Sequence, residues 1–161
     1  MITETTRPLG PWTAHLEAMD RAIAASNASA AVLAWRHAYA AALDQLGWRG
    51  LVEVAAAALR IGTIPGFKKA AESRARESYW TALFRARRQG SLDGVLETAQ
   101  AFGALSDRVM VEQCVRIAER LAVLTGDADA ADRVRALAAD LAQRYVDVDR
   151  EASGTPSGGR P

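Results

Sequence analysis

Cysteine and lysine are scarce in this chain of 161 residues. Cys114 is the single cysteine, so no disulfide can form within the chain. It falls at helical spacing with Val111 and Ala118, which predicts a buried and unreactive thiol. A reducing compartment is the simplest location for such a protein, and we expect the cytoplasm. Lys68 and Lys69 are the only lysines, and with the abundant alanine this usage is typical of a GC-rich bacterial genome.

Long apolar runs are also missing. No segment approaches the ~18 consecutive apolar residues that a membrane helix requires. Residues 1–20 contain no apolar stretch of the kind found in signal peptides. We therefore expect no membrane partner. The formal net charge is +1, so the chain as a whole is not a polyelectrolyte.

The residue patterns of common catalytic and metal sites are absent. His15 and His37 are the only histidines, and neither has a second metal ligand four residues further along. The sequence holds no phosphate-binding loop, dinucleotide fingerprint or Gly-x-Ser-x-Gly motif. Glu53 and Glu97 hold matching positions near the starts of two predicted helices, where carboxylates favour the positive helix end. We expect no enzyme activity, metal or cofactor, although a site assembled from scattered acids would leave no motif.

The apolar pattern predicts an all-α fold, because alternation with period two is nearly absent. Capping residues, glycines and prolines divide the chain into about seven helices. The predicted N-caps are Asn27 or Ser29, Ser91, Asp107, and Asp127 or Asp129. The predicted helices cover roughly residues 11–26, 28–46, 48–61, 67–89, 92–105, 108–125 and 128–150. Gly47 and Gly90 follow two of these helices, where glycine accepts the left-handed backbone of a helix end.

The short connections predict antiparallel packing of successive helices. We therefore expect a single all-α domain over residues 10–150, built of stacked antiparallel α-hairpins. Residues 1–9 are expected to be a flexible N-terminus. Residues 151–161, EASGTPSGGRP, are rich in Gly, Ser and Pro and are expected to form a disordered tail.

Two features indicate repeated hairpins. A shift of 44 positions aligns Gly50 and Glu53 with Gly94 and Glu97, which is evidence for an internal repeat. In addition, the segment AFGALSDRVMVEQCVRIAERLA resembles a tetratricopeptide-repeat hairpin, mainly over residues 92–123. The matching residues are Ala99 and Phe102 in the first helix, Ser106 and Asp107 in the turn, and Ala118 in the second helix. The resemblance implies a right-handed stack of hairpins with a concave binding face, and a plain seven-helix bundle is the alternative.

Basic residues concentrate in the predicted helix 67–89 and just before it. From Arg60 to Arg88 the chain has eight basic and two acidic residues, a net +6, which leaves 12 basic and 17 acidic residues, a net −5, elsewhere. The near-neutral total therefore hides a strong charge asymmetry. Helical spacing defines a face of this helix that we expect in the core: Ala75, Tyr79, Ala82, Leu83 and Ala86.

The rest of this helix combines two aromatic residues with arginines. The candidate partner-binding residues are Arg74, Arg76, Trp80, Phe84, Arg85, Arg87 and Arg88. An apolar aromatic pair framed by arginines is typical of a docking surface. A neighbouring helix that covers Trp80 and Phe84 would leave nothing exposed.

This basic helix has three interpretations. Its arginines pair with acidic residues of neighbouring helices on a solvated face, dock an acidic protein or a second copy of the chain, or bind the phosphates of a nucleic acid. The pI of 7.9 is low for a dedicated nucleic-acid binder. Our hypothesis is a non-catalytic protein–protein interaction module, such as an adaptor, scaffold or regulatory subunit. Nucleic-acid association through the same helix is the alternative.

Overall fold

The structure of the chain, a computed structural model, describes residues 10–154. These residues form seven α-helices and no strand, so the all-α prediction is confirmed. The helices are α1 (Thr13–Ala24), α2 (Ala28–Leu43), α3 (Arg49–Ile61), α4 (Lys68–Arg88), α5 (Leu92–Ala104), α6 (Arg108–Thr125) and α7 (Ala128–Ser153). Residues 1–9, predicted to be flexible, lie outside the described part of the chain.

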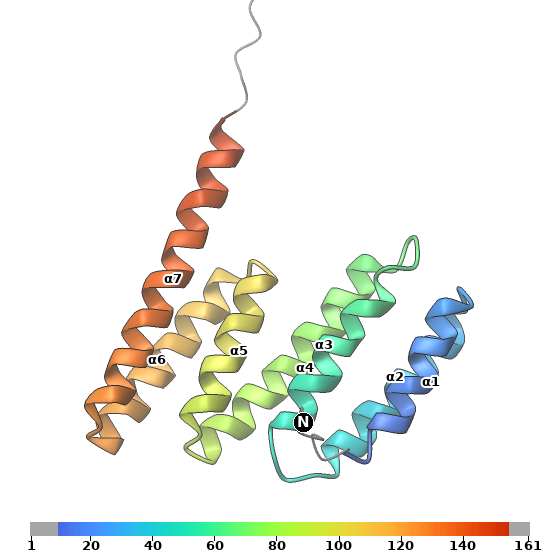
Figure 1. Cartoon of the computed structure of the whole chain (residues 1–161), viewed down its shortest axis with the longest axis horizontal. Coiled ribbons are helices and arrows are strands. Elements are labelled where there is room, and N and C mark those ends of the chain that lie inside the picture. The colour runs from blue at the N-terminus through green and yellow to red at the C-terminus, as the bar shows by residue number, and fades with distance from the viewer. Residues whose placement is uncertain (1–9, 155–161) are drawn as a thin grey trace, which may run out of the picture.

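The helices form an open row, with α1 and α2 at one end and α7 at the other (Figure 1). Each helix packs most closely on the helices that precede and follow it in the chain. Successive odd-numbered helices also contact one another: α1 packs on α3, α3 on α5 and α5 on α7. The described chain is therefore an array of helical hairpins whose two ends stay apart.

Short polar side chains begin four of the helices. Asn27, Ser91, Asp107 and Asp127 each accept a hydrogen bond from a backbone N–H of the first turn. A side-chain oxygen at this position satisfies a donor that the helix itself leaves free. All four belong to the N-caps expected from the sequence pattern.

A left-handed residue stands directly before each of these caps. The residues are Ser26, Gly90, Ser106 and Gly126, with φ of 54°, 65°, 56° and 65°. A left-handed residue closes the preceding helix, so only two or three residues join the end of one helix to the start of the next. Gly90 confirms the prediction made for it.

Gly47 does not adopt the left-handed conformation predicted for it. α2 ends earlier, at Leu43, and residues 44–48 form a longer connection to α3. The prediction was wrong because the end of α2 is closed by side chains of α4 and of the residue after it instead of by a glycine. Gln89 donates one of these hydrogen bonds, 2.7 Å from its Nε2 to the carbonyl oxygen of Leu46.

Two tryptophans pack against glycines of the next odd-numbered helix. Trp12 directly precedes α1 and lies on Gly50 near the start of α3. Trp48 directly precedes α3 and lies on Gly94 near the start of α5. A Cβ atom added to either glycine would lie 2.7 Å from the indole ring. The Gly50–Gly94 match in the sequence thus marks one packing contact that the chain makes twice.

Alanine supplies nearly half of the buried apolar residues of the core. Its small side chain allows helices to approach closely, and larger residues such as Met19, Leu51 and Phe102 fill the space between them. Cys114 is fully buried in this core, as its spacing predicts. The core therefore runs along the whole row, with α3 contributing the largest share of fully buried positions.

The C-terminal boundary of the domain needs correction. α7 extends to Ser153, so residues 151–153 are helical, although the sequence pattern assigned them to a disordered tail. Glu151 and Ala152 favour helix, and Ser153 Oγ donates a 2.7 Å hydrogen bond to the carbonyl oxygen of Asp149. Gly154 is the first residue that ends the helix. The remainder of the predicted tail, residues 155–161, lies outside the described residues.

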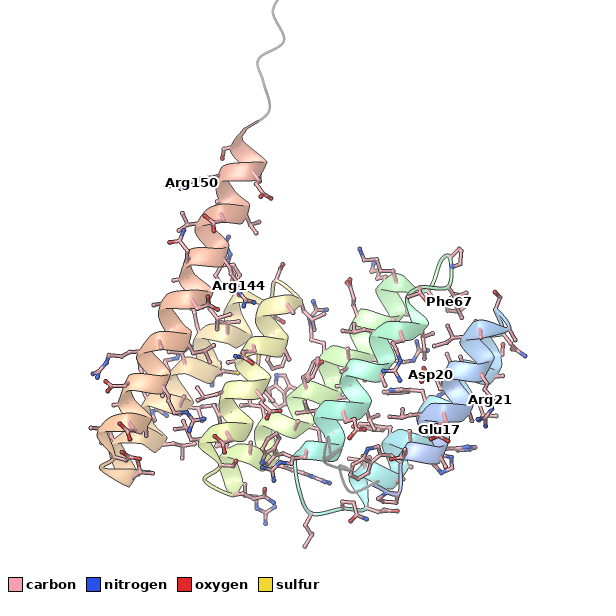
Figure 2. The ribbon with its side chains drawn as sticks, viewed as in Figure 1. Glu17, Asp20, Arg21, Phe67, Arg144 and Arg150 are labelled. Carbon is pink, nitrogen blue, oxygen red and sulfur yellow. The ribbon has the colours of Figure 1, made fainter. Side chains whose placement is uncertain are left out.

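Both terminal helices carry exposed charged side chains. Glu17 and Arg21 are exposed on α1, and Arg144 and Arg150 are exposed on α7, with Arg150 on the side away from the other helices (Figure 2). Charged side chains on the end helices are what a stack of helices needs in water, because further stacking would bury charge. None of the helices within residues 10–154 is both long and apolar enough to cross a membrane.

Candidate functional site

α4 has one buried face and one exposed face that carries two aromatic residues. The five residues predicted to face the core are all buried. The aromatic residues one turn apart on the other face are not covered by a neighbouring helix, since Trp80 is 56% exposed and Phe84 is 55% exposed. Burying an exposed aromatic side chain against a partner is energetically favourable. Two such side chains next to each other therefore mark a surface that can bind another molecule.

These aromatics form one wall of an apolar groove between α4 and α6. The groove has a volume of about 140 Å³ and is lined by Trp80, Leu83, Phe84 and Arg87 from α4 and by Val109, Met110, Gln113 and Ile117 from α6. Leu83 and Ile117 are almost fully buried and form its floor, whereas Val109 at the rim is 73% exposed. Neither helix alone has this groove.

A hydrogen bond fixes the tryptophan at one end of the groove. The indole Nε1–H of Trp80 donates to Sδ of Met110 at 3.3 Å, a contact between the two walls. The indole ring is therefore held in place by the protein itself, while the adjacent Met110 side chain is adaptable. A groove with a fixed ring and an adaptable wall can accept an apolar side chain with little loss of its own conformational freedom.

Positive charge borders the other end of the groove. Arg87 lines it and Arg88 follows, and both side chains are exposed. Neither forms an ion pair within residues 10–154. Further along α6, the exposed residues Arg116 and Arg120 flank the apolar pair Val123 and Leu124, which are 80% and 81% exposed.

The remaining arginines of the candidate set have other surroundings inside the protein. Arg85 lies on the α2 side of α4 and donates to the carbonyl oxygens of Ala42, Leu43, Gln45 and Gly47. Its guanidinium thus satisfies acceptors that the end of α2 leaves free. This arginine stabilises the α2–α3 connection and is not part of the groove.

Arg76 and Arg74 also lie away from the groove. Arg76 Nε donates to Asp107 Oδ2 at 3.1 Å, and Asp107 is the residue that caps α6. Arg74 is half-buried, and its Nη1 atom is buried without a hydrogen-bond partner within the described residues. Of the seven candidates, therefore, Trp80, Phe84 and Arg87 line the groove, Arg88 borders it, and three lie elsewhere.

The sequence pattern missed the α6 wall of the groove. Val109 and Met110 are apolar, but they fall outside the core stripe of Val111, Cys114 and Ala118. Apolar residues off the core stripe were a usable signal for a second apolar face of α6. That this face lies beside Trp80 depends on helix packing, which one helix at a time does not reveal.

Exposed apolar residues follow the same side of the array over a longer distance. Six of the nine large apolar residues exposed within residues 10–154 belong to even-numbered helices: Leu33, Trp80, Phe84, Val109, Val123 and Leu124. In the same part of the chain, none belongs to α1, α3 or α5. The array thus has two layers, one of even-numbered helices (α2, α4 and α6) and one of odd-numbered helices (α1, α3 and α5). The exposed large apolar residues of these six helices all lie in the even-numbered layer.

The described residues contain no group of three or more His, Cys, Asp or Glu side chains that could hold a metal ion. The rings of His15 and His37 meet edge-on with centroids 5.5 Å apart, across α1 and α2. Burial raises the pKa of the Cys114 thiol to about 11, which keeps it in the unreactive protonated form at neutral pH. These groups offer no evident nucleophile or metal centre.

No protein-family model matches the chain, and no curated protein matches it in sequence.

Proposed function

We propose that the chain is a non-catalytic protein–protein interaction module that binds its partner in the groove between α4 and α6. The observation that carries this proposal is the groove itself, in which half-exposed Trp80 and Phe84 stand over an apolar floor beside two exposed arginines. Tryptophan and arginine are among the residues that contribute most to protein interfaces. The partner that fits is an amphipathic helix with small apolar anchors and acidic flanks.

The dimensions of the groove support a peptide segment over a small molecule. A volume of about 140 Å³ is below the ~300 Å³ at which pockets for drug-sized ligands begin. Trp80 and Arg87 are seven residues apart on α4, which corresponds to ~10 Å along the helix axis. That length matches two turns of a docked helix, so one or two side chains would enter the groove.

The placement of the arginines favours a protein partner over a nucleic acid. Arg76 and Arg85 have intramolecular partners, so fewer charges remain free than the sequence suggests. The exposed charges of Arg87 and Arg88 adjoin aromatic and aliphatic side chains instead of a longer basic stripe. Phosphate binding depends on several cations along one track.

The finer architecture and the location belong to the same proposal. We infer a tetratricopeptide-like arrangement from paired helices, contacts between successive odd-numbered helices and the repeated Trp–Gly contact. Such stacks bind peptides along one face. The buried thiol of Cys114, which is not in a disulfide, agrees with a reducing bacterial cytoplasm as the site of action.

A photo-crosslinking experiment tests this proposal. Gln113 is exposed and lines the groove, and Gln100 is exposed on α5 in the other layer. A photoreactive amino acid placed at either position replaces the same residue type in the full chain. In the cells that produce the protein, we expect a crosslinked partner from position 113 and none from position 100.

A pair of charge reversals then examines the role of the arginines. Arg87→Glu with Arg88→Glu should weaken the crosslink from position 113. Lys68→Glu with Lys69→Glu makes the same charge change at the other end of α4 and should leave it intact. Equal crosslinks at positions 113 and 100, or none at 113, would contradict a binding groove. A crosslink to nucleic acid would establish the alternative.

A further inference from the structure

α7 continues well beyond the helices on which it packs. Its C-terminal part, residues 144–153, projects past the ends of α5 and α6, with Arg144 near its base and Arg150 further out (Figures 1 and 2). We call residues 144–153 the overhang. Apart from the contacts of Tyr145 and Asp149 with Arg108, the overhang is exposed in the described structure, which makes it available to another molecule.

The apolar stripe of α7 continues into the overhang. Leu141 is buried against the array, Tyr145 is half-buried, and Val148 and Ala152 further along are exposed. At 100° per residue, Tyr145, Val148 and Ala152 lie within ~60° of one another. The stripe that packs on α5 and α6 thus extends about two turns past them without a helix of the described chain to cover it.

Acidic side chains border the exposed stripe. Arg144 pairs with Asp140, and Asp149 pairs with Arg108, so these charges are already matched. Asp147 and Glu151 form no ion pair within residues 10–154 and lie one turn apart on one flank of the helix, Glu151 about 60° and Asp147 about 100° from Val148. Arg150, which also forms no ion pair there, lies about 160° from Val148, on the opposite face of the helix. The overhang therefore presents small apolar side chains next to two carboxylates that no cation of the described chain neutralises.

We propose that the groove between α4 and α6 binds the overhang of a second copy of this chain. The inference rests on the proposed function and names the partner of the same groove. Val148 and Ala152 are small enough for a groove of about 140 Å³. Asp147 and Glu151, on one flank of the overhang, meet Arg87 and Arg88, so charges of opposite sign are brought together along that edge of the contact.

The overhang cannot reach the groove of its own chain. On α6, the groove uses Val109, Gln113 and Ile117, whereas α7 packs on the other side, beside Arg108 and Val115. Arg108 holds the base of the overhang in place. Its guanidinium lies 4.5 Å from the ring centroid of Tyr145, and its Nη2 donates to Asp149 Oδ1 at 2.7 Å. A continuous helix held in this way points away from its own groove.

Charge favours this pairing over the two symmetric alternatives. A contact between two grooves offers no carboxylate to Arg87 and Arg88 of either copy. A contact between two overhangs offers no cation to Asp147 and Glu151. Like charges brought together in an interface weaken association, so the groove–overhang pairing is the favoured contact between copies.

Sedimentation velocity on the full chain over a concentration series tests the inference. We expect reversible association that weakens as salt is raised. The groove variant carries Arg87→Glu with Arg88→Glu, and the overhang variant carries Asp147→Arg with Glu151→Arg. Each should weaken association by about ten-fold or more. Lys68→Glu with Lys69→Glu, the matched control, should associate as the wild type does.

Mixing the groove variant with the overhang variant gives the decisive result. Each variant alone places like charges in its contact. In a mixture, the acidic groove of one variant meets the basic overhang of the other, and the native groove meets the native overhang. An equimolar mixture should therefore regain association, which loss of folding cannot imitate.

Two results would refute the inference. One is a wild-type chain that stays monomeric up to high micromolar concentration, and the other is association that both variants retain. In either case a crosslink from position 113 to a different protein would keep the proposed function intact, so the two proposals fail separately.

Discussion

Arg85 should govern stability although the sequence pattern places it among the binding residues. Its Nη2 donates to the carbonyl oxygen of Leu43 at 2.7 Å, and its Nη1 lies 3.4 Å and 3.3 Å from those of Ala42 and Gly47. These acceptors form the C-terminal end of α2 and the loop after it, where the helix dipole concentrates negative charge. Arg85→Met removes the donors and the charge and keeps an apolar side chain of similar reach.

The expected loss follows from the shortest of these contacts. A hydrogen bond to a charged group contributes about 1.5–3 kcal/mol, and a cation at a helix end contributes about 0.3–1 kcal/mol. Because the side chain is only partly buried, solvent replaces part of both contributions, and we expect a net loss of about 2 kcal/mol. For a chain of 161 residues this corresponds to a fall in Tm of about 4–8 °C.

Urea unfolding followed by circular dichroism measures this loss. Arg87→Met and Arg88→Met are matched controls two and three residues further along α4, and each should change stability by less than about 0.5 kcal/mol. Arg85→Lys keeps the charge but not the fork of donors, so its stability should fall between the wild type and Arg85→Met. If Arg85→Met unfolds at the same urea concentration as Arg87→Met, the contacts with α2 contribute nothing and the reasoning fails.

Three other substitutions or reactions examine the fold. Gly94→Ala should destabilise the protein by about 1–2 kcal/mol, because its Cβ would lie 2.7 Å from Trp48, whereas helix propensity alone predicts a gain of about 1 kcal/mol; urea unfolding decides the sign. Ser106→Gly should stabilise the protein by about 0.5–1 kcal/mol, since Ser106 adopts a φ of 56° that strains an L-residue; an unchanged or lower Tm would contradict this. Cys114, with a pKa raised by burial to about 11, should react with a thiol reagent at pH ~8 only as fast as the chain unfolds; rapid labelling of the native protein would show that the thiol is accessible.

Local sequence signals predicted the helices well. Features that depend on contacts between distant segments could not be predicted in this way. Asn27, Ser91 and Asp107 marked helix starts because capping is a property of a few adjacent residues. The core face of α4 followed from the helical period for the same reason. Gly47 failed because the end of α2 is closed by Arg85, about forty residues further along the chain, and no local pattern carries that information.

The candidate site shows the same limit. Helical spacing placed Trp80 and Phe84 away from the core face, and the structure leaves both exposed. The sequence pattern could not separate Arg87, beside the groove, from Arg85, turned toward α2, because both are arginines two residues apart on one helix. Their difference arises from the neighbours that each face of α4 meets in the array.

The row of hairpins also has a consequence for how the chain folds. Its substantial helix–helix contacts join helices that are one or two apart in the chain, so few long loops must close before packing begins. Chains with such a low contact order fold rapidly, and a linear array can begin to fold at any hairpin. The heavily buried α3–α4 hairpin is the natural nucleus, from which order would spread in both directions and reach the free end of α7 last.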